Sequence, residues 1–188
     1  PHVSQTASDL LESSLGEESI NIITSHFPIN ELWGSRSSKG THIQTLLQKS
    51  PQMSVGHTHP SAMELYRYGD TLNCICPAMV EEDRFVIGTV DNGQFIYHEM
   101  DPRRRNDLIF TFPIPKSQLT SRSYFDYTDV PIRVLQFSEK CLPVKVFLDG
   151  KEMIQLDFQR ELQTGVFFHS AKVTIEKGDH KILIKDNY

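Results

Sequence analysis

The chain has 188 residues, of which 38% are hydrophobic and 23% are charged, so it can bury a core and has the composition of a globular protein. Its net charge is −5, which argues against a nucleic-acid partner, because a surface that binds phosphates needs many spread cations. Its apolar runs are shorter than the roughly 18 residues of a membrane span, so no membrane partner is expected. Three cysteines without a disulfide framework favour a reducing, intracellular setting, and the cytoplasm is the expected compartment.

The N-terminal half reads as a mixture of short helices and strands. Ser8 or Asp9 is a suitable helix cap, and Gly16 is a suitable helix end. Asn92-Gly93 supplies the positive φ angles of a tight hairpin turn. The expected elements are a helix over 4–15, a strand over 21–27, a hairpin of 31–38 with 41–47, a strand over 53–59, a short helix from residue 70, and a hairpin of 85–90 with 94–98.

The C-terminal half reads as a series of short strands separated by turns. Asp149-Gly150 and the segment 177–179 are typical turn sequences. The expected strands cover 108–112, 132–137, 144–148, 153–158, 166–168, 173–175 and 182–184, with a loop over 116–129. Many short strands at near-regular spacing predict an antiparallel, sandwich-like module.

One short segment carries residues that are suited to metal chemistry. His57 and His59 follow an apolar run and are two positions apart, so on an extended strand both imidazoles face the same side. Pro60 ends the strand and favours an extended backbone at His59. Asp70 follows eleven positions after His59. Two imidazoles and one carboxylate are a plausible set of three zinc ligands with an open fourth position.

The string His57-Thr58-His59-Pro60, followed after six residues by Arg67-Tyr68-Gly69-Asp70, resembles the JAMM motif of the JAB1/MPN metalloprotease family. The resemblance covers roughly residues 20–100. It implies an α+β protein, with a JAB1/MPN-like mixed β-sheet and flanking helices over 1–112. The β-sandwich-like module over 113–188 would then position a substrate or partner.

The same resemblance implies a zinc-dependent hydrolase of peptide or isopeptide bonds, with a protein or peptide substrate such as a ubiquitin-like conjugate. In that family the two histidines and the aspartate hold Zn²⁺, which assigns His57, His59 and Asp70 as ligands. Glu31 is the candidate general base, because Glu31-Leu32-Trp33-Gly34 is similar to the family's Glu-x-x-Gly. Arg67 stands where the family has the serine that supports the oxyanion, and a guanidinium stabilises an oxyanion by its charge.

Three alternatives stay open. Family members without an intact site serve as assembly subunits, and both Arg67 and the short spacing from Glu31 to His57 favour such a scaffold. The pattern His57-x-His59-x4-Glu64 also resembles the first cupin motif, in which Glu64 is a ligand to Fe, Mn or Ni and Asp70 is a turn residue. Two surface imidazoles at the end of a strand, without any metal, are the third alternative.

Overall fold

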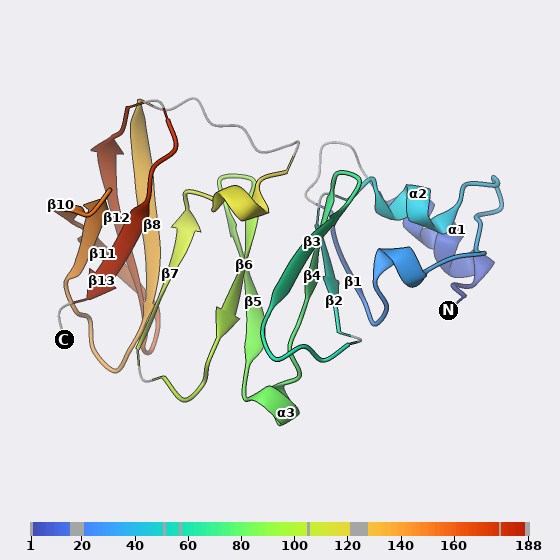
Figure 1. Ribbon diagram of the computed structural model, residues 1–188, viewed down its shortest axis with the longest axis horizontal. Coiled ribbons are helices and arrows are strands. Elements are labelled where there is room, and N and C mark those ends of the chain that lie inside the picture. The colour runs from blue at the N-terminus through green and yellow to red at the C-terminus, as the bar shows by residue number, and fades with distance from the viewer. Residues whose placement is uncertain are drawn as a thin grey trace.

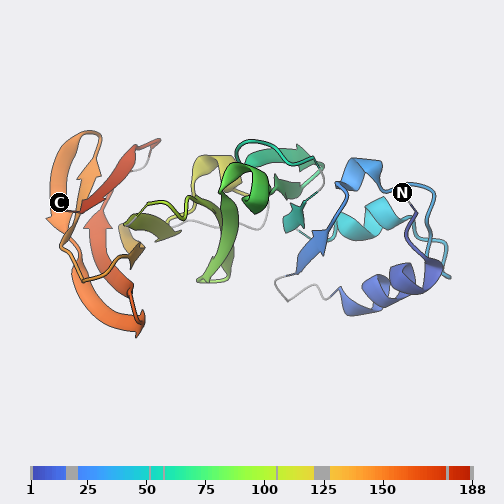
Figure 2. The ribbon, with the colours of Figure 1, turned by 90° about the horizontal axis from the view of Figure 1, so that it is seen from below.

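The computed structural model describes residues 2–15, 21–50, 52–56, 58–104, 106–120, 128–176 and 178–186. Strands hold 46% of these residues and helices only 15%. The expected α+β fold of the JAB1/MPN type, with a sheet flanked by helices, is therefore wrong. Figure 1 shows an elongated molecule, with the N-terminal helices and a small sheet at one end and a β-sandwich at the other. Figure 2 shows the two chain ends at opposite ends of this body.

The N-terminal sheet has four strands in the order β1-β2-β4-β3. They are β1 (Ile22–Ser25), β2 (Gln52–Val55), β3 (Glu64–Tyr68) and β4 (Thr71–Ile75). β1, β2 and β4 are parallel, whereas β3 forms an antiparallel hairpin with β4. Ser25 pairs with Val55, and Val55 pairs with Ile75. The three parallel strands therefore end at the same level.

Short helices pack beside this sheet. They are α1 (Gln5–Ser14), the 3-10 turn η1 (Ile29–Glu31) and α2 (Ile43–Leu47). The predicted N-terminal helix is confirmed, but its cap is Ser4, whose hydroxyl accepts a hydrogen bond from the backbone of Ala7. The predicted strand over 41–47 is wrong. Ile43, Leu46 and Leu47 have helical spacing and are all buried, so the segment forms α2.

A two-stranded hairpin lies between the N-terminal sheet and the sandwich (Figure 1). It consists of β5 (Phe85–Asp91) and β6 (Gln94–Met100), and it follows the short helix α3 (Met79–Glu82). The hairpin prediction is confirmed, since Asn92 and Gly93 have φ angles of 49° and 72°. The helix predicted from Asp70 is wrong, because all five residues of β4 are buried in the sheet.

The sandwich contains two sheets, with strand orders β11-β12-β8-β7 and β10-β9-β13. Its strands are β7 (Asp107–Phe112), β8 (Asp129–Phe137), β9 (Val144–Leu148), β10 (Lys151–Gln155), β11 (Asp157–Gln163), β12 (Val166–Thr174) and β13 (Ile182–Asp186). The 3-10 turn η2 (Lys116–Gln118) lies between β7 and β8 in the chain. Apolar side chains of both sheets meet in one core, which contains Ile132, Val134, Val144, Val146, Leu156 and Val173. The strands expected over 108–112, 132–137, 144–148 and 182–184 are present. The single strand expected over 153–158 is wrong, because residue 156 separates β10 from β11, which belong to different sheets. The two strands expected over 166–168 and 173–175 are one continuous strand, β12, which pairs with β8 along its whole length.

Two connections define how the sandwich joins the chain. β7 pairs with β8, so the C-terminal sheet begins at Asp107, before the expected boundary at residue 113. The chain passes from one sheet to the other through a single residue, Leu156, between β10 and β11. Leu156 is buried, and its backbone N–H donates to the carbonyl of Val144.

Asp91 links the central hairpin to the sandwich. Its carboxylate accepts a hydrogen bond of 2.7 Å from the hydroxyl of Thr111 on β7, and it forms an ion pair with Arg133 on β8. Both partners of this ion pair are largely shielded from solvent, with side-chain exposures of 17% for Asp91 and 29% for Arg133.

Replacing Asp91 by alanine is expected to lower the free energy of unfolding by about 1–3 kcal/mol, because it leaves the Thr111 hydroxyl and the Arg133 guanidinium without this acceptor. Urea titration followed by circular dichroism measures the change. Asp157→Ala is the matched control, since Asp157 lies on the exposed strand β11. Equal effects of the two substitutions would show that the contacts of Asp91 do not stabilise the fold.

Candidate functional site

The carboxyl edge of the three parallel strands gathers residues that are suited to metal binding. Because β1, β2 and β4 end at the same level, the next residues in the chain, His26, Gly56 and Cys76, follow neighbouring strands at one edge. Sheets with parallel strands bind ligands outside such carboxyl ends. His26 is exposed and packs edge-to-face on Phe27, with 4.8 Å between ring centroids.

His59 belongs to the loop that leaves β2 at the same edge. Its φ angle is 45°, in the left-handed region, so the extended conformation predicted before Pro60 is wrong. A left-handed residue that is not glycine is uncommon, and strained backbone of this kind concentrates at functional sites. Its Nδ1 atom lies 3.3 Å from Oε2 of Glu81 on α3. The other ring nitrogen, Nε2, is thus the one that this contact leaves available.

Of the other two predicted zinc ligands, only Asp70 is among the described residues. His57 lies outside the described residues, so its role as a ligand stays a prediction. Asp70 is exposed in the turn between β3 and β4, whereas His59 precedes β3. The two residues are therefore at opposite ends of a five-residue strand, which spans roughly 13 Å at about 3.3 Å per residue. Figure 1 shows this turn and the loop after β2 at opposite ends of the sheet.

The predicted catalytic residues, Glu31 and Arg67, lie on η1 and β3. Glu31 is the last residue of η1. Burial raises the pKa of Tyr66 on β3, and the negative charge of Glu31 raises it further. Arg67 is exposed on β3 and donates a hydrogen bond to the carbonyl of Leu119, beyond η2. Their roles as base and oxyanion donor stay predictions. Glu64, the ligand of the cupin alternative, begins β3 and thus lies at the same end of this strand as His59.

The donor set partly fits a zinc ion. Imidazole nitrogen is a ligand that Zn²⁺ prefers, and His26 and His59 supply two such donors after neighbouring parallel strands. Within the described ranges, no group of three His, Cys, Asp or Glu side chains lies close enough to hold a metal ion. A complete site at this edge therefore needs a further donor, and His57 is the residue that the sequence offers.

His26 and Glu81 are the residues that sequence reasoning missed. The sequence predicts the strand before His26, but only its parallel pairing with β2 brings the end of this strand level with the end of β2. No pattern in the sequence predicts the pairing of β1 with β2. Glu81 is 22 positions after His59, and the fold of β3, β4 and α3 brings its side chain into contact with His59.

Cys76 follows β4 at this edge, but the chemistry of the cysteine pair is unlike that of a reactive thiol. A hydrogen bond of the neutral Cys74 thiol with Cys76, followed by burial, raises the pKa of Cys74. A thiol with a raised pKa carries little thiolate at neutral pH, and the thiolate is the nucleophile and the metal ligand. Neither a nucleophilic nor a zinc-binding role of Cys74 is therefore supported.

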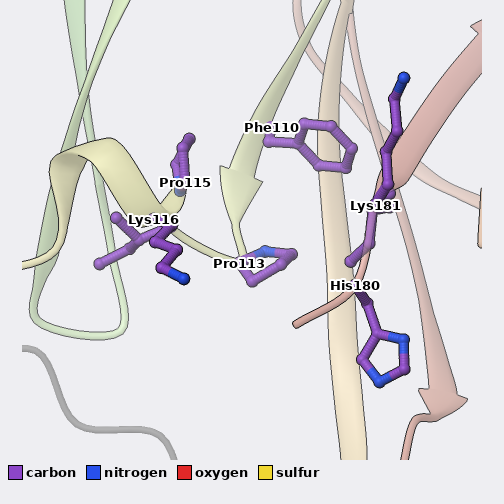
Figure 3. Close-up of a pocket in the computed structure, with 8 residues that line it drawn as sticks. Phe110, Pro113, Pro115, Lys116, His180 and Lys181 are labelled. Carbon is purple, nitrogen blue, oxygen red and sulfur yellow. The ribbon is translucent and has the colours of Figure 1, made fainter. Parts of the chain in front are cut away.

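A hollow lies on the sandwich, at the start of β13. It has a volume of about 290 Å³ and is lined by Phe110, Pro113, Ile114, Pro115, Lys116, His180, Lys181 and Ile182. Figure 3 shows Pro115 and Lys116 on one side, His180 and Lys181 on the other, and Pro113 between them.

Two of the charged groups of this hollow, Lys116 and His180, are paired within the chain. Lys116 Nζ lies 2.7 Å from a carboxylate oxygen of Asp179. His180 contacts Asp149 through Nδ1 at 2.8 Å, and this contact, followed by one with the carbonyl of Glu176, raises the pKa of His180. These contacts form a local network at the surface of the protein, and they give no support for a catalytic role of the hollow.

In the described ranges, no helix is long and apolar enough to cross a membrane. Comparison with protein-family models, with curated proteins and with solved structures found no match for this chain. The resemblance to the JAMM motif therefore rests on the motif residues alone.

Proposed function

We propose that the carboxyl edge of the N-terminal sheet is a zinc-dependent hydrolytic site. The observation that carries the proposal is the parallel register of β1 and β2, which sets His26 beside the start of the Gly56–His59 segment. His26 and His59 are the described candidate ligands, and His57 is the third candidate from the sequence. Asp70 has no part in this version of the site, because it lies at the far end of β3.

Zinc supplies a nucleophile at neutral pH by lowering the pKa of a bound water to about 7. The residues of the chain have simpler roles: the imidazoles bind the metal through neutral nitrogens, and the strand ends hold them in place. The exposed position of His26 and His59 leaves the edge open to a large substrate.

A substrate panel is needed to identify the bond that the protein cleaves. Peptide and isopeptide bonds are the substrates that the JAMM resemblance implies, and they stay a proposal. Metal-activated water also attacks carboxylic and phosphoric esters. A substrate panel should therefore contain a peptide, a ubiquitin-like conjugate, p-nitrophenyl acetate and bis(p-nitrophenyl) phosphate.

Metal content of the purified protein tests the proposal. We expect about one zinc per chain after zinc supplementation, a loss of most of it in His26→Ala, His57→Ala and His59→Ala, and no loss in Asp70→Ala. Retention of zinc in all three histidine variants would overturn the proposed site. Loss in Asp70→Ala together with His59→Ala, but not in His26→Ala, would instead restore the ligand set of the JAMM spacing.

A non-catalytic scaffold is the second candidate function. It is favoured by apolar side chains on the two exposed strands β10 and β11, where Met153, Ile154, Phe158 and Leu162 are each at least 38% exposed. Large exposed apolar side chains can supply contacts to a protein partner. Bound zinc without hydrolysis of any substrate in the panel would favour the scaffold. The intracellular, cytoplasmic setting also stays a proposal, and it is supported by the absence of disulfides among the three cysteines.

A further inference from the structure

The turn after β7 reaches from the sandwich to the central hairpin. It comprises residues 116–119, most of which form η2, and we call it the clasp. Lys116 contacts Asp179 of the sandwich, and Gln118 contacts Tyr97 of the hairpin. We propose that the clasp fixes the hairpin at one angle to the sandwich, and that the hairpin swings when Gln118 releases Tyr97. This inference goes beyond the proposed function and does not depend on it.

Gln118 makes the central contact of the clasp. Its Oε1 atom accepts a hydrogen bond of 2.8 Å from the backbone N–H of Tyr97, and its Nε2 atom donates one of 2.9 Å to the carbonyl of Tyr97. Gln118 is 5% exposed and Tyr97 is 2% exposed. A glutamine amide carries the same donor and acceptor as a peptide group, so Gln118 takes the place of a neighbouring strand beside β6.

The backbone of Tyr97 depends on this amide. Tyr97 is opposite Gly88 in the hairpin, and every second pair of an antiparallel ladder directs its N–H and C=O groups away from the partner strand. Both groups of Tyr97 are directed to Gln118. A buried peptide group without partners is costly, so removal of the amide favours a movement that brings water to Tyr97.

The clasp itself is anchored to the sandwich. It follows β7 closely, and Pro113 and Pro115 restrict the backbone between the strand and the clasp. The backbone N–H of Gln118 donates a hydrogen bond of 2.8 Å to the carbonyl of Pro115, which closes η2. Lys116 Nζ lies 2.7 Å from a carboxylate oxygen of Asp179, between β12 and β13 in the chain. Figure 1 shows η2 in yellow, beside the hairpin.

Asp91 supplies a further attachment of the hairpin to the sandwich, through Thr111 and Arg133. Asp91 ends β5, next to the tight turn, whereas Tyr97 lies within β6. A body that is held at two separate places keeps its angle, and a body that is held at one place can pivot. Loss of the contact with Gln118 therefore leaves Asp91 as the pivot of the hairpin.

A hollow at the other end of the hairpin leaves room for this movement. It has a volume of about 380 Å³ and is lined by Phe85 and Met100 of the hairpin and by Phe137 and Gly165 of the sandwich, among others. Phe85 and Met100 pair at the end of the hairpin that is remote from its turn. Parts of a chain that meet without a large packed interface move relative to one another unless specific contacts hold them.

The N-terminal sheet is expected to move with the hairpin. The side chain of Tyr97 belongs to a buried cluster with Leu72 and Cys74 of β4, which joins the hairpin to this sheet. Arg67 on β3 donates a hydrogen bond to the carbonyl of Leu119, the last residue of the clasp. The clasp thus contacts all three parts of the molecule, and its release changes the angle between the N-terminal sheet and the sandwich.

Residual dipolar couplings of backbone amides, measured by NMR on the full chain, report this angle. In the wild type we expect one alignment tensor to fit the amides of β5 and β6 together with those of β8 and β12. In Gln118→Ala we expect two different tensors and smaller couplings in the hairpin, because averaging over several angles reduces them. Gln163→Ala is the matched control, since it removes an exposed glutamine of β11, and it should retain one tensor.

Gln118→Glu tests the two hydrogen bonds separately. A carboxylate still accepts the hydrogen bond from the N–H of Tyr97, but it has no donor for the carbonyl of Tyr97. We therefore expect two tensors in this variant as well. In the wild type, a scalar coupling across the hydrogen bond from the Tyr97 nitrogen to the side-chain carbonyl carbon of Gln118 detects the contact directly.

Three results would overturn the proposal. The first is one common tensor in both Gln118→Ala and Gln118→Glu. The second is a wild type that already needs two tensors, because its hairpin would then not be held at one angle. The third is a loss of the native amide shifts of β8 and β12 in both variants, which would show that the sandwich unfolds together with the clasp and that the hairpin has no separate movement.

Discussion

Replacing Ile132 by alanine is expected to lower the free energy of unfolding by about 2–5 kcal/mol. Ile132 lies on β8, is fully buried, and packs where the two sheets of the sandwich meet. The substitution removes buried apolar surface and leaves a cavity between two sheets whose strands cannot fully close over it. A chemical denaturation curve recorded by circular dichroism gives the change.

Ile154→Ala is the matched control, because it makes the same chemical change on the exposed strand β10, where the side chain is 38% exposed. The control should change the free energy of unfolding by less than about 0.5–1 kcal/mol. A similar effect of both substitutions would contradict the assignment of Ile132 to the core of the sandwich.

Lowering the pH from 7 to 5 is expected to cost about 2 kcal/mol of folding stability through His98. Burial lowers the pKa of His98 to about 4, against 6.5 for an ordinary histidine, and its Nε2 atom lies 3.0 Å from the hydroxyl of Thr89. Between pH 6.5 and 4 the unfolded chain binds a proton at this residue and the folded chain does not. The contribution of neutral His98 to folding stability is therefore complete above pH 6.5 and is lost as the pH falls.

The test compares the pH dependence of urea unfolding in the wild type and in His98→Gln, whose amide can still contact Thr89. We expect a smaller loss of stability at pH 5 in the variant. His169, whose pKa burial also lowers, will retain part of the effect. His180→Gln is the control of opposite sign, because its contact with Asp149 raises the pKa of His180 and stabilises the fold at low pH. An unchanged pH dependence in His98→Gln would contradict the burial of this imidazole.

Local sequence signals predicted the elements that depend on local geometry. The Asn92-Gly93 turn determines the central hairpin, since both residues adopt the positive φ angles that such turns require. Short apolar runs between turn sequences likewise predicted most strands of the sandwich. These signals act between neighbours in the chain and need no knowledge of the partner strand.

The remaining features depend on contacts that are distant in sequence. A string such as 43–47 contains apolar residues that suit either a strand or a helix, and burial against the N-terminal sheet selects the helix. Motif spacing counts residues but carries no information on strand direction. The turn after β3 therefore sends Asp70 away from His59, although eleven residues separate them in the chain.

The crossing at Leu156 has a consequence for how the sandwich opens. The residues before it belong to one sheet and the residues after it belong to the other, with no slack between them. Strand β10 therefore cannot separate from its sheet without displacing β11 in the other sheet. Backbone amides of β10 and β11 should thus exchange with solvent deuterium in one concerted event, and a protease should find no partly opened form in which a single layer has come apart.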